Sequence, residues 1–298
     1  MADQAPTYYA QEFATIIMLL LQQKGSRLRG TVTSKEQFGS QASPVDQVGP
    51  VEMQPVIGRF APMGRIDPPA NRRWVQPNPF DLPQLVDRFD LMKMVIDPKS
   101  AYVQTAVAAA GRQIDRTIIN GYFGSNATGV AGATATAFNA SNVVAVNFGA
   151  SGNTGLTVAK LREARRLLMS YNIDMEEEEF FCVMSATQHD NLLAEIQVIS
   201  LDYNDKPVMV DGLIRRFMGF NFKFTQLLPY NVGGSGTTVR NVMAYVKSGV
   251  HLGLWQDQRT DVSQRKDLQG LPWQIYLWLM IGATRTEENR CIQINCQE

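Results

Sequence analysis

Apolar residues recur every three or four positions between residues 97 and 124, a spacing that predicts one long helix. The repeat places six side chains on one face, namely Val103, Val107, Ala110, Ile114, Ile118 and Tyr122. Asp97 can cap the start, and Pro98 suits the first helical position because a donor there would be unpaired anyway. We therefore expect a helix over residues 98–123, about 39 Å long, that forms a spine for other layers.

A polar group of side chains on this helix falls mostly on another face. It consists of Arg112, Gln113, Asp115 and Arg116. Gly121 and Gly124 follow, and glycine commonly terminates a helix. The helix is thus predicted to be two-sided, with the apolar stripe as its buried side.

Residues 7–24 show the same periodicity and predict a second helix. Its apolar face contains Tyr9, Phe13, Ile16, Ile17, Leu20 and Leu21. Met18 and Leu19 widen that face, so the helix should be buried against either the protein's own core or a neighbouring subunit. The run Ile16–Leu21 is far shorter than the ~20 apolar residues that span a bilayer, so we expect no membrane partner.

Residues 34–96 change character, because ten of the fourteen prolines lie between Pro44 and Pro98. Proline excludes a regular helix, so we expect an extended two-stranded ribbon there. Its predicted strand-forming runs are Val51–Ile57, Gly58–Ile66 and Arg72–Gln76. The segment is too apolar for a disordered linker, and an apolar arm of this length needs a partner's surface to lie on.

The second half of the chain mixes helices and strands. Residues 125–155 predict a loop around one short strand, Asn142–Phe148, and helices begin after Thr157 and Ser185, the latter reaching about Ile196. The expected strands are Phe180–Met184, Asn221–Leu227, Val239–Val246, Leu252–Trp255, Trp273–Ile281 and Arg290–Cys296, with a loop tip at Gly233–Gly236. The order has no regular βαβ units, which indicates the α+β class.

Composition narrows the function. Lysine plus arginine equals aspartate plus glutamate at 28 each, so the net charge is zero, which argues against a protein that mainly neutralises nucleic-acid phosphates. The three cysteines are too few and of the wrong parity for a disulfide framework, which favours reduced thiols in a cytoplasmic setting. Cys291 and Cys296 should face opposite sides of one strand.

The sequence offers little catalytic chemistry. With only His189 and His251 present, no metal site of the usual spacing can be built. The glycine-rich runs at 149–155 and 233–238 lack the lysine of a phosphate loop. Ser185, His189 and Asp190 could suggest a triad, but neighbours on a helix point in different directions. We therefore predict no catalytic, cofactor-binding or metal-binding residue, no cofactor and no enzymatic activity.

Two clusters of charged residues can be explained as solvent-exposed surface. Arg162, Arg165 and Arg166 could form an anion site or, more simply, a solvated helix face. The acidic run Glu176–Glu179 is interpreted as a solvated loop, because no ligand pattern surrounds it.

The order of these parts resembles the major capsid proteins of tailed bacteriophages, which share the Hong Kong phage coat protein fold. The resemblance covers nearly the whole chain: the proline-rich ribbon, then DPKSAYVQTAVAAAGRQIDRTIINGYFG, then SNATGVAGA, and finally IGATRTEENRCIQI as the most specific piece. It implies an N-terminal arm at 1–33, an extended loop at 34–85, a peripheral domain at 86–124 and 249–298, and an axial domain at 125–248.

The function implied by the resemblance is self-assembly, as pentamers and hexamers, into an icosahedral head that encloses double-stranded DNA. The implied partners are further copies of the chain, a separate scaffolding protein, a portal protein, an optional decoration (cement) protein, and packaged DNA without sequence-specific contact. The implied location is the virion, after assembly in the host bacterial cytoplasm. No residue pattern supports the Lys–Asn cross-link of some family members.

Three alternatives stay open. An encapsulin-like shell would hold a protein cargo in place of DNA. A soluble hydrolase would use Ser185 or Asp190. A tube or decoration subunit would form rods or bind only to preformed shells.

Overall fold

The computed structural model describes residues 22–39, 42–60, 64–87, 99–195, 209–210, 212–232 and 238–298. The caps Asp97 and Pro98, the tip Gly233–Gly236 and most of the helix predicted over 7–24 lie outside these ranges. Residues 22–24, the predicted end of that helix, are not helical.

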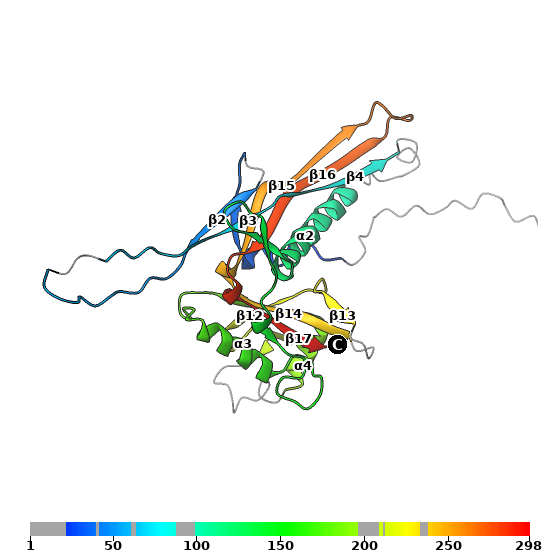
Figure 1. Ribbon diagram of the computed structural model, residues 1–298. Helices are drawn as coiled ribbons and strands as arrows, with labels where there is room; N and C mark the ends of the chain where they lie inside the picture. Colours follow the sequence, from blue (N-terminus) through cyan, green and yellow to red (C-terminus); the bar gives the residue numbers. More distant parts are fainter. Residues whose placement is uncertain are drawn as a thin grey trace, which may run out of the picture.

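The predicted spine is confirmed as helix α2, Lys99–Phe123, the longest helix in the described part of the chain (Figure 1). Its fully buried side chains include Ala106, Ala110, Ile114, Ile118 and Tyr122, close to the predicted stripe. Val103 is only half-buried. At the end of α2 the Tyr122 hydroxyl donates to the Ile292 carbonyl at 2.6 Å, which ties the helix to the second sheet described below.

Helix α2 packs on a four-stranded sheet with the order β1-β15-β16-β4. The strands are β1 (Thr33–Glu36), β15 (Val250–Gln264), β16 (Trp273–Arg285) and β4 (Asn78–Val86). Strand β1 runs parallel to β15, and the other pairs are antiparallel. Side chains alternate between the two faces of a strand, so every second residue of β16 points toward α2. Ile281, Leu279 and Leu277 join the first core in this way.

A second sheet has the order β11-β12-β8-β14-β17-β7, with β13 also paired to β14. Its strands are β11 (Arg216–Phe217), β12 (Phe220–Phe224), β8 (Phe180–Met184), β14 (Thr238–Val246), β17 (Cys291–Gln297), β7 (Val143–Val144) and β13 (Tyr230–Val232). Helices α3 (Val158–Ser170) and α4 (Ala186–Leu193) lie along one side of it (Figure 1).

This second sheet separates two cores. Phe181 and Val183 of β8 join the core under α2, whereas Cys182 and Met184 join the core under α3 and α4. The predicted opposite orientation of Cys291 and Cys296 is confirmed, because they lie in the first and second core respectively. Both faces of the sheet are therefore covered, which explains the continuous burial of β8.

A third sheet joins the loop ribbon to the end of the spine, with the order β2-β3-β5-β6. Its strands are β2 (Ser43–Val48), β3 (Ala70–Val75), β5 (Asn126–Thr128) and β6 (Thr134–Thr136). The short pair β9 (Met209–Val210) and β10 (Leu213–Ile214) stands apart from it. Four 3₁₀ turns complete the described elements: η1 (Arg29–Thr31), η2 (Ala140–Asn142), η3 (Lys247–Gly249) and η4 (Glu288–Arg290).

Several predicted strand bounds were wrong. Residues 51–60 and 64–66, the described part of the first two predicted runs, form no strand; the ribbon's paired strands are β2 and β3, on either side of that segment, and β3 corresponds to the predicted run Arg72–Gln76. The strand expected over 142–148 is only Val143–Val144, and α4 ends at Leu193. Strand β15 extends well beyond the predicted 252–255. Strand β17 pairs with β14, so the last strand of the chain lies in the second sheet.

Candidate functional site

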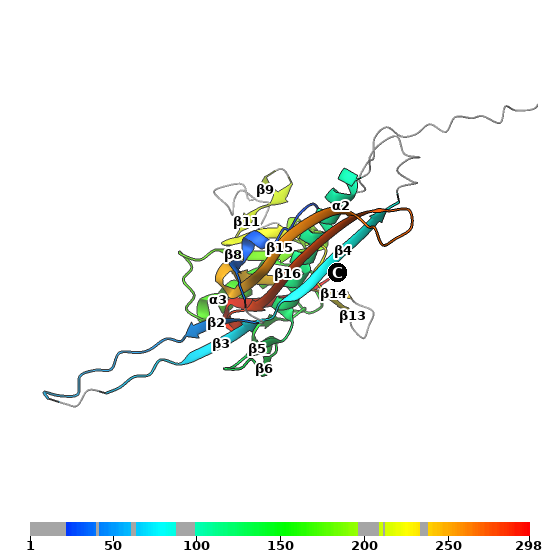
Figure 2. The same ribbon diagram turned by 90° about the horizontal axis from the view of Figure 1, so that it is seen from above.

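The connection between β2 and β3 is a long extended loop that projects from the body of the molecule in both views (Figures 1 and 2). From here on, the term extended loop means residues 49–69, the part of the predicted 34–85 segment that lies between β2 and β3. It carries large apolar side chains in solvent, with Met53 and Phe60 fully exposed at 101% and 102%. Val51, Val56 and Ile57 are exposed as well. Nothing among the described residues covers this apolar surface.

The base of the extended loop is held by directed polar contacts. The Gly49 amide donates to the Pro69 carbonyl at 2.6 Å where the ribbon ends. Arg72 pairs with Asp46 across the strands at 2.5 Å, and this contact raises the pKa of the Arg72 guanidinium. The Trp74 indole donates to the Gly129 carbonyl at 2.8 Å. The loop therefore leaves the body in a defined direction.

A pair of glycines lets this base approach the first sheet closely. Gly253 of β15 and Gly282 of β16 lie opposite each other. A Cβ on Gly282 would lie 2.1 Å from the Gln76 carbonyl oxygen, and one on Gly253 would lie 3.2 Å from a Val75 methyl group. The neighbour of Gly282 is backbone, and only glycine permits such an approach of one backbone to another, whereas Gly253 faces side chains.

The loop base is also connected to the end of the spine through a buried arginine. Arg285 is fully buried, and its guanidinium donates to the Tyr122 carbonyl and, at 2.6 Å, to the Gly124 carbonyl at the end of α2. Glu288 accepts from Arg285 at 3.0 Å and faces Arg73 of β3 at 3.4 Å. Burial lowers the pKa of Arg73, a cost that the Glu288 carboxylate partly offsets. The network joins the loop, the spine and η4.

The predicted polar face of α2 is wrong at one position, because Asp115 is fully buried. Its carboxylate accepts hydrogen bonds from the Gln23 side chain at 2.6 Å, the Ser26 hydroxyl at 2.5 Å, and the Arg27 and Leu28 amides at 3.1 Å each. These donors belong to the segment that enters the fold from the N-terminal side. Asp115 is therefore an anchor for that segment, which residue spacing alone did not reveal.

A second buried charge was also missed. Lys160 of α3 is fully buried, and its ammonium group donates to the carbonyls of Thr154, Gly155 and Asn295 at 2.8, 2.9 and 3.0 Å. Burial lowers the pKa of this amine. The contacts tie α3 and the preceding loop to β17, which is a structural role.

The structure does not bring Ser185, His189 and Asp190 together as a catalytic triad. Ser185 is fully buried, and it caps α4 through Gln188, which confirms the predicted capping role. His189 Nε2 accepts a hydrogen bond from the Ile214 amide at 3.3 Å, and the ring packs edge-on against Phe224. Burial lowers the pKa of His189. No hydrogen bond between these three side chains occurs among the described residues.

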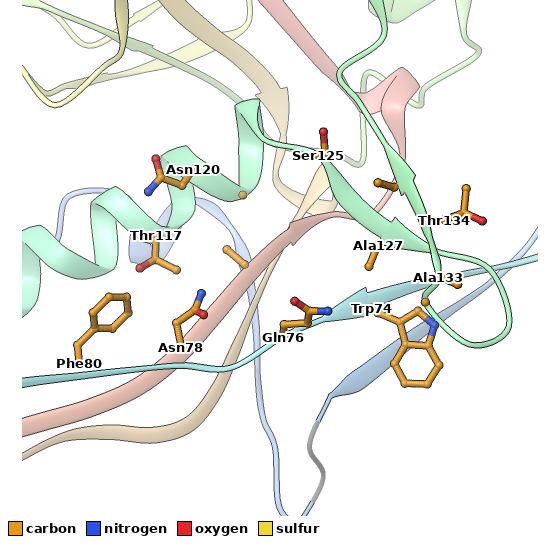
Figure 3. A pocket seen from close by; sticks show the side chains of 14 residues that line it. Trp74, Gln76, Asn78, Phe80, Thr117, Asn120, Ser125, Ala127, Ala133 and Thr134 are labelled. Atoms are coloured by element: carbon orange, nitrogen blue, oxygen red, sulfur yellow. The ribbon is translucent and has the colours of Figure 1, made fainter.

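A cavity of about 340 Å³ lies between the end of α2, the start of β4 and the β5–β6 hairpin. Figure 3 shows Thr117 and Asn120 on the helix side and Gln76 and Asn78 along the chain below them. The described residues that line it carry amide, hydroxyl and apolar groups but no titratable side chain. The cavity therefore offers no acid, base or charged ligand group.

Most side chains of the two charged clusters, Arg162–Arg166 and Glu176–Glu179, form ion pairs or hydrogen bonds. Arg166 pairs with Glu163 at 2.6 Å, and Arg165 donates to the Met218 carbonyl. Glu179 pairs with Lys247, and Glu178 pairs with Arg290. Within the described ranges, no group of histidine, cysteine, aspartate and glutamate residues is arranged to hold a metal ion. The described helices also include none that is long and apolar enough to cross a membrane.

Comparisons with known proteins identify the architecture. The sequence profile of a family described as phage capsid protein matches residues 5–298. The chain therefore belongs to the phage capsid protein family. A search of curated proteins gave no match.

Solved structures agree with this assignment. The capsid of cyanophage Pam1 superposes with a TM-score of 0.73 at 12% identity, covering 100% of this chain and 99% of that one. The capsid of cyanophage P-SCSP1u gives 0.72 at 12%, covering 97% and 93%. The capsid of Ralstonia phage GP4 gives 0.70 at 14%, covering 99% and 97%. The expected α+β capsid fold is confirmed, and the chain is a structural protein of a phage virion.

Proposed function

We propose that this chain is the major capsid protein of its phage and self-assembles, as pentamers and hexamers, into a closed shell around double-stranded DNA. The observation that carries the proposal is the extended loop, which exposes apolar side chains on a firmly held base. Soluble monomers rarely expose large contiguous apolar surface, so such a surface indicates a partner. A second copy of the chain is the partner that a shell supplies.

The geometry suits ring formation. A loop that projects to one side meets a different patch on the next copy, and such head-to-tail contacts close into rings when the rotation permits. Permanent interfaces of this kind bury about 2,000 Å² or more in total. Each contact can be modest, because many simultaneous contacts on a closed shell reinforce one another.

The remaining partners are part of the same proposal. Zero net charge leaves copies free to pack densely and does not require a basic groove, so DNA would be confined without sequence-specific contact. A separate scaffolding protein would set the shell's size, a portal protein would occupy one vertex, and a decoration protein would bind the finished shell. Assembly would take place in the bacterial cytoplasm.

The test changes the loop without disturbing the fold. Phe60→Asp places a charge on a side chain that is 102% exposed, so the free energy of subunit unfolding should change by less than about 0.5 kcal/mol. Gln54→Asp is the matched control, since it adds the same charge at an exposed polar position of the same loop.

Both variants and the unaltered chain would be expressed with and without a scaffolding partner and observed by negative-stain electron microscopy. We expect shells from the unaltered chain and the control, and folded but unassembled subunits from Phe60→Asp. Normal shells from Phe60→Asp would refute the role of the loop. The ratio of nucleic acid to protein in particles recovered from infected cells separates a DNA-filled head from an encapsulin-like shell with protein cargo.

A further inference from the structure

The outer half of β15 has an unpaired edge in the part of the chain that the structure describes. Strand β1 pairs only with residues 251–254 of β15, whereas β16 stays paired with β15 on its other side as far as Gln264. Beyond β1, the edges of the first sheet are therefore β15 and β4, with β16 between them (Figure 2). Residues 257–263 of β15 are exposed to solvent.

The two edges of this sheet are protected differently. Strand β4 carries Pro79 and Pro83, which lack the amide donor that an added strand would need. The outer half of β15, residues 256–264, contains neither proline nor lysine. Edge strands without such protection are ready to pair with another strand. The sequence thus blocks one edge and leaves the other able to accept a neighbour.

Two unlike charges stand on this unpaired edge. Arg259 and Asp261 lie on the same face of β15, because they pair with Trp278 and Tyr276 of β16 at alternate positions. Both side chains are exposed, and neither has an ion-pair partner among the described residues. Thr260 lies between them on the other face. An added strand could therefore satisfy both charges only by offering the opposite charge at each position.

We infer that this edge pairs with the same edge of a second copy, antiparallel about a two-fold axis at Thr260. In this register Arg259 lies opposite Asp261 of the second copy, and the symmetry repeats that pair in reverse. Thr260 lies opposite its own counterpart. Opposite charges directly across an antiparallel pair stabilise it, whereas like charges destabilise it. The strand is therefore complementary to itself.

The other two-fold registers fit less well. A two-fold axis has to lie at a residue, because opposite residues must both point toward or both point away from the partner strand. An axis at Asp261 would place that carboxylate opposite itself. An axis at Gln258 would oppose Asp257 and Arg259, but Asp257 is already paired with Arg29 at 2.7 Å, and the register of β15 is irregular there. Only the axis at Thr260 uses both unpaired charges.

This contact rests on the proposed shell, in which it would complement the extended loop. The loop contact is head-to-tail and closes rings, whereas a shell also needs contacts that join one ring to the next. A symmetric contact through β15 is of that second kind. The strand pair is short, so it should be weak between free subunits and effective when it is repeated over a shell.

Charge reversal tests the register. Arg259→Asp would place aspartates opposite each other in every contact, and Asp261→Arg would place arginines opposite each other. We expect each variant alone to lower the yield of shells about tenfold or more, because the unfavourable pairs recur at every contact. Lys266→Asp is the matched control, since it reverses an exposed charge of the same hairpin outside the paired segment.

The two single variants should rescue each other. When Arg259→Asp and Asp261→Arg subunits are co-expressed, each contact between unlike subunits regains two pairs of opposite charge. Shells should then return to within about twofold of the control yield, and the double variant should assemble for the same reason. Normal shells from both single variants, or losses that co-expression does not rescue, would overturn the two-fold pairing.

Thiol cross-linking tests the contact without requiring shells. Opposite Cβ atoms of an antiparallel pair lie about 5 Å apart, so Thr260→Cys should bring two thiols together. Val262→Cys is the control on the same exposed face, because in this register its two thiols would be about 14 Å apart. The native cysteines are buried, and burial raises the pKa of their thiols, so they should compete little.

The full-length variants would be treated with a bifunctional thiol reagent too short to span the control distance. We expect covalent dimers of Thr260→Cys to form about tenfold faster than those of Val262→Cys. Equal rates, or no dimer, would overturn the pairing. Failure of the unaltered chain to form shells would count against the proposed capsid function, and the cross-linking rates would still decide whether the edges meet.

Discussion

Removing the carboxylate of Asp115 should release the segment that enters the fold at residues 23–28. The side chain is fully buried on α2 and accepts bonds from two side chains and two backbone amides of that segment. Asp115→Ala leaves those donors without their acceptor. Asp115→Asn keeps one oxygen and turns an amide group toward the donors.

The magnitude follows from the donors that lose their partner. Each buried donor left unsatisfied costs about 1–3 kcal/mol, and two backbone amides depend on this carboxylate. Relief from burying a charge offsets part of that cost, so we expect Asp115→Ala to lower the free energy of unfolding by about 3 kcal/mol. Asp115→Asn should cost roughly half as much, because one acceptor remains.

Urea unfolding of unassembled subunits, followed by circular dichroism, measures the effect. Trypsin cleavage after Lys24 and Arg27 reports the release of the segment itself, and it should accelerate in parallel. Arg116→Ala is the matched control, since this exposed neighbour on the same helix should change stability by less than about 0.5 kcal/mol. A loss below about 1 kcal/mol in Asp115→Ala would refute the anchoring role.

Three further outcomes can be checked. Arg285→Met should lower the free energy of unfolding by about 3–5 kcal/mol, because it removes the buried partner of Glu288 and of the carbonyls at the end of α2. Thermal unfolding measures this loss, and an unchanged midpoint would contradict it. Gly282→Ala should displace the base of the extended loop, because its Cβ would overlap the Gln76 carbonyl. The second sheet should stay folded, whereas shells should be absent or misshapen in electron micrographs. Burial, with a smaller effect of Lys35, lowers the pKa of His251 below its ordinary 6.5. The stability that the neutral ring contributes is therefore complete above pH ~6.5 and is lost as the pH falls through the lowered folded value. Urea unfolding at pH 7.5 and 5 should show a lower free energy of unfolding at pH 5, and His251→Gln should reduce that difference.

Helix α2 could be predicted closely because its information is local. An apolar repeat sustained over many turns and followed by glycine leaves few alternatives, and α2 ends at Phe123 as predicted, while the predicted first residue, Pro98, lies outside the described residues. Asp115 was misjudged for the opposite reason. Its partners lie about ninety positions earlier in the chain, and a carboxylate looks like a surface residue until those partners are known.

The strands were predicted less well where their pairing is non-local. The outer half of β15, from Gln256 to Gln264, is almost entirely exposed and polar, so it shows no strand-like alternation; it is a strand because β16 pairs with it. The strands predicted in the extended loop were wrong for a different reason. Its apolar residues look like strand formers, but they project beyond any partner strand of their own chain, so pairing stops at Val48 and Ala70.

The pairing of β1 with β15 has a consequence for the order of events in the cell. Thr33, near the start of the chain, must align with His251, near its end. Domains are completed from the N-terminal side as synthesis proceeds, and contacts between distant residues form slowly. The first sheet therefore cannot close on the ribosome until almost the whole chain has emerged. A nascent chain would be unable to nucleate a particle, so the pool of finished subunits, and not translation itself, would set the moment at which assembly begins.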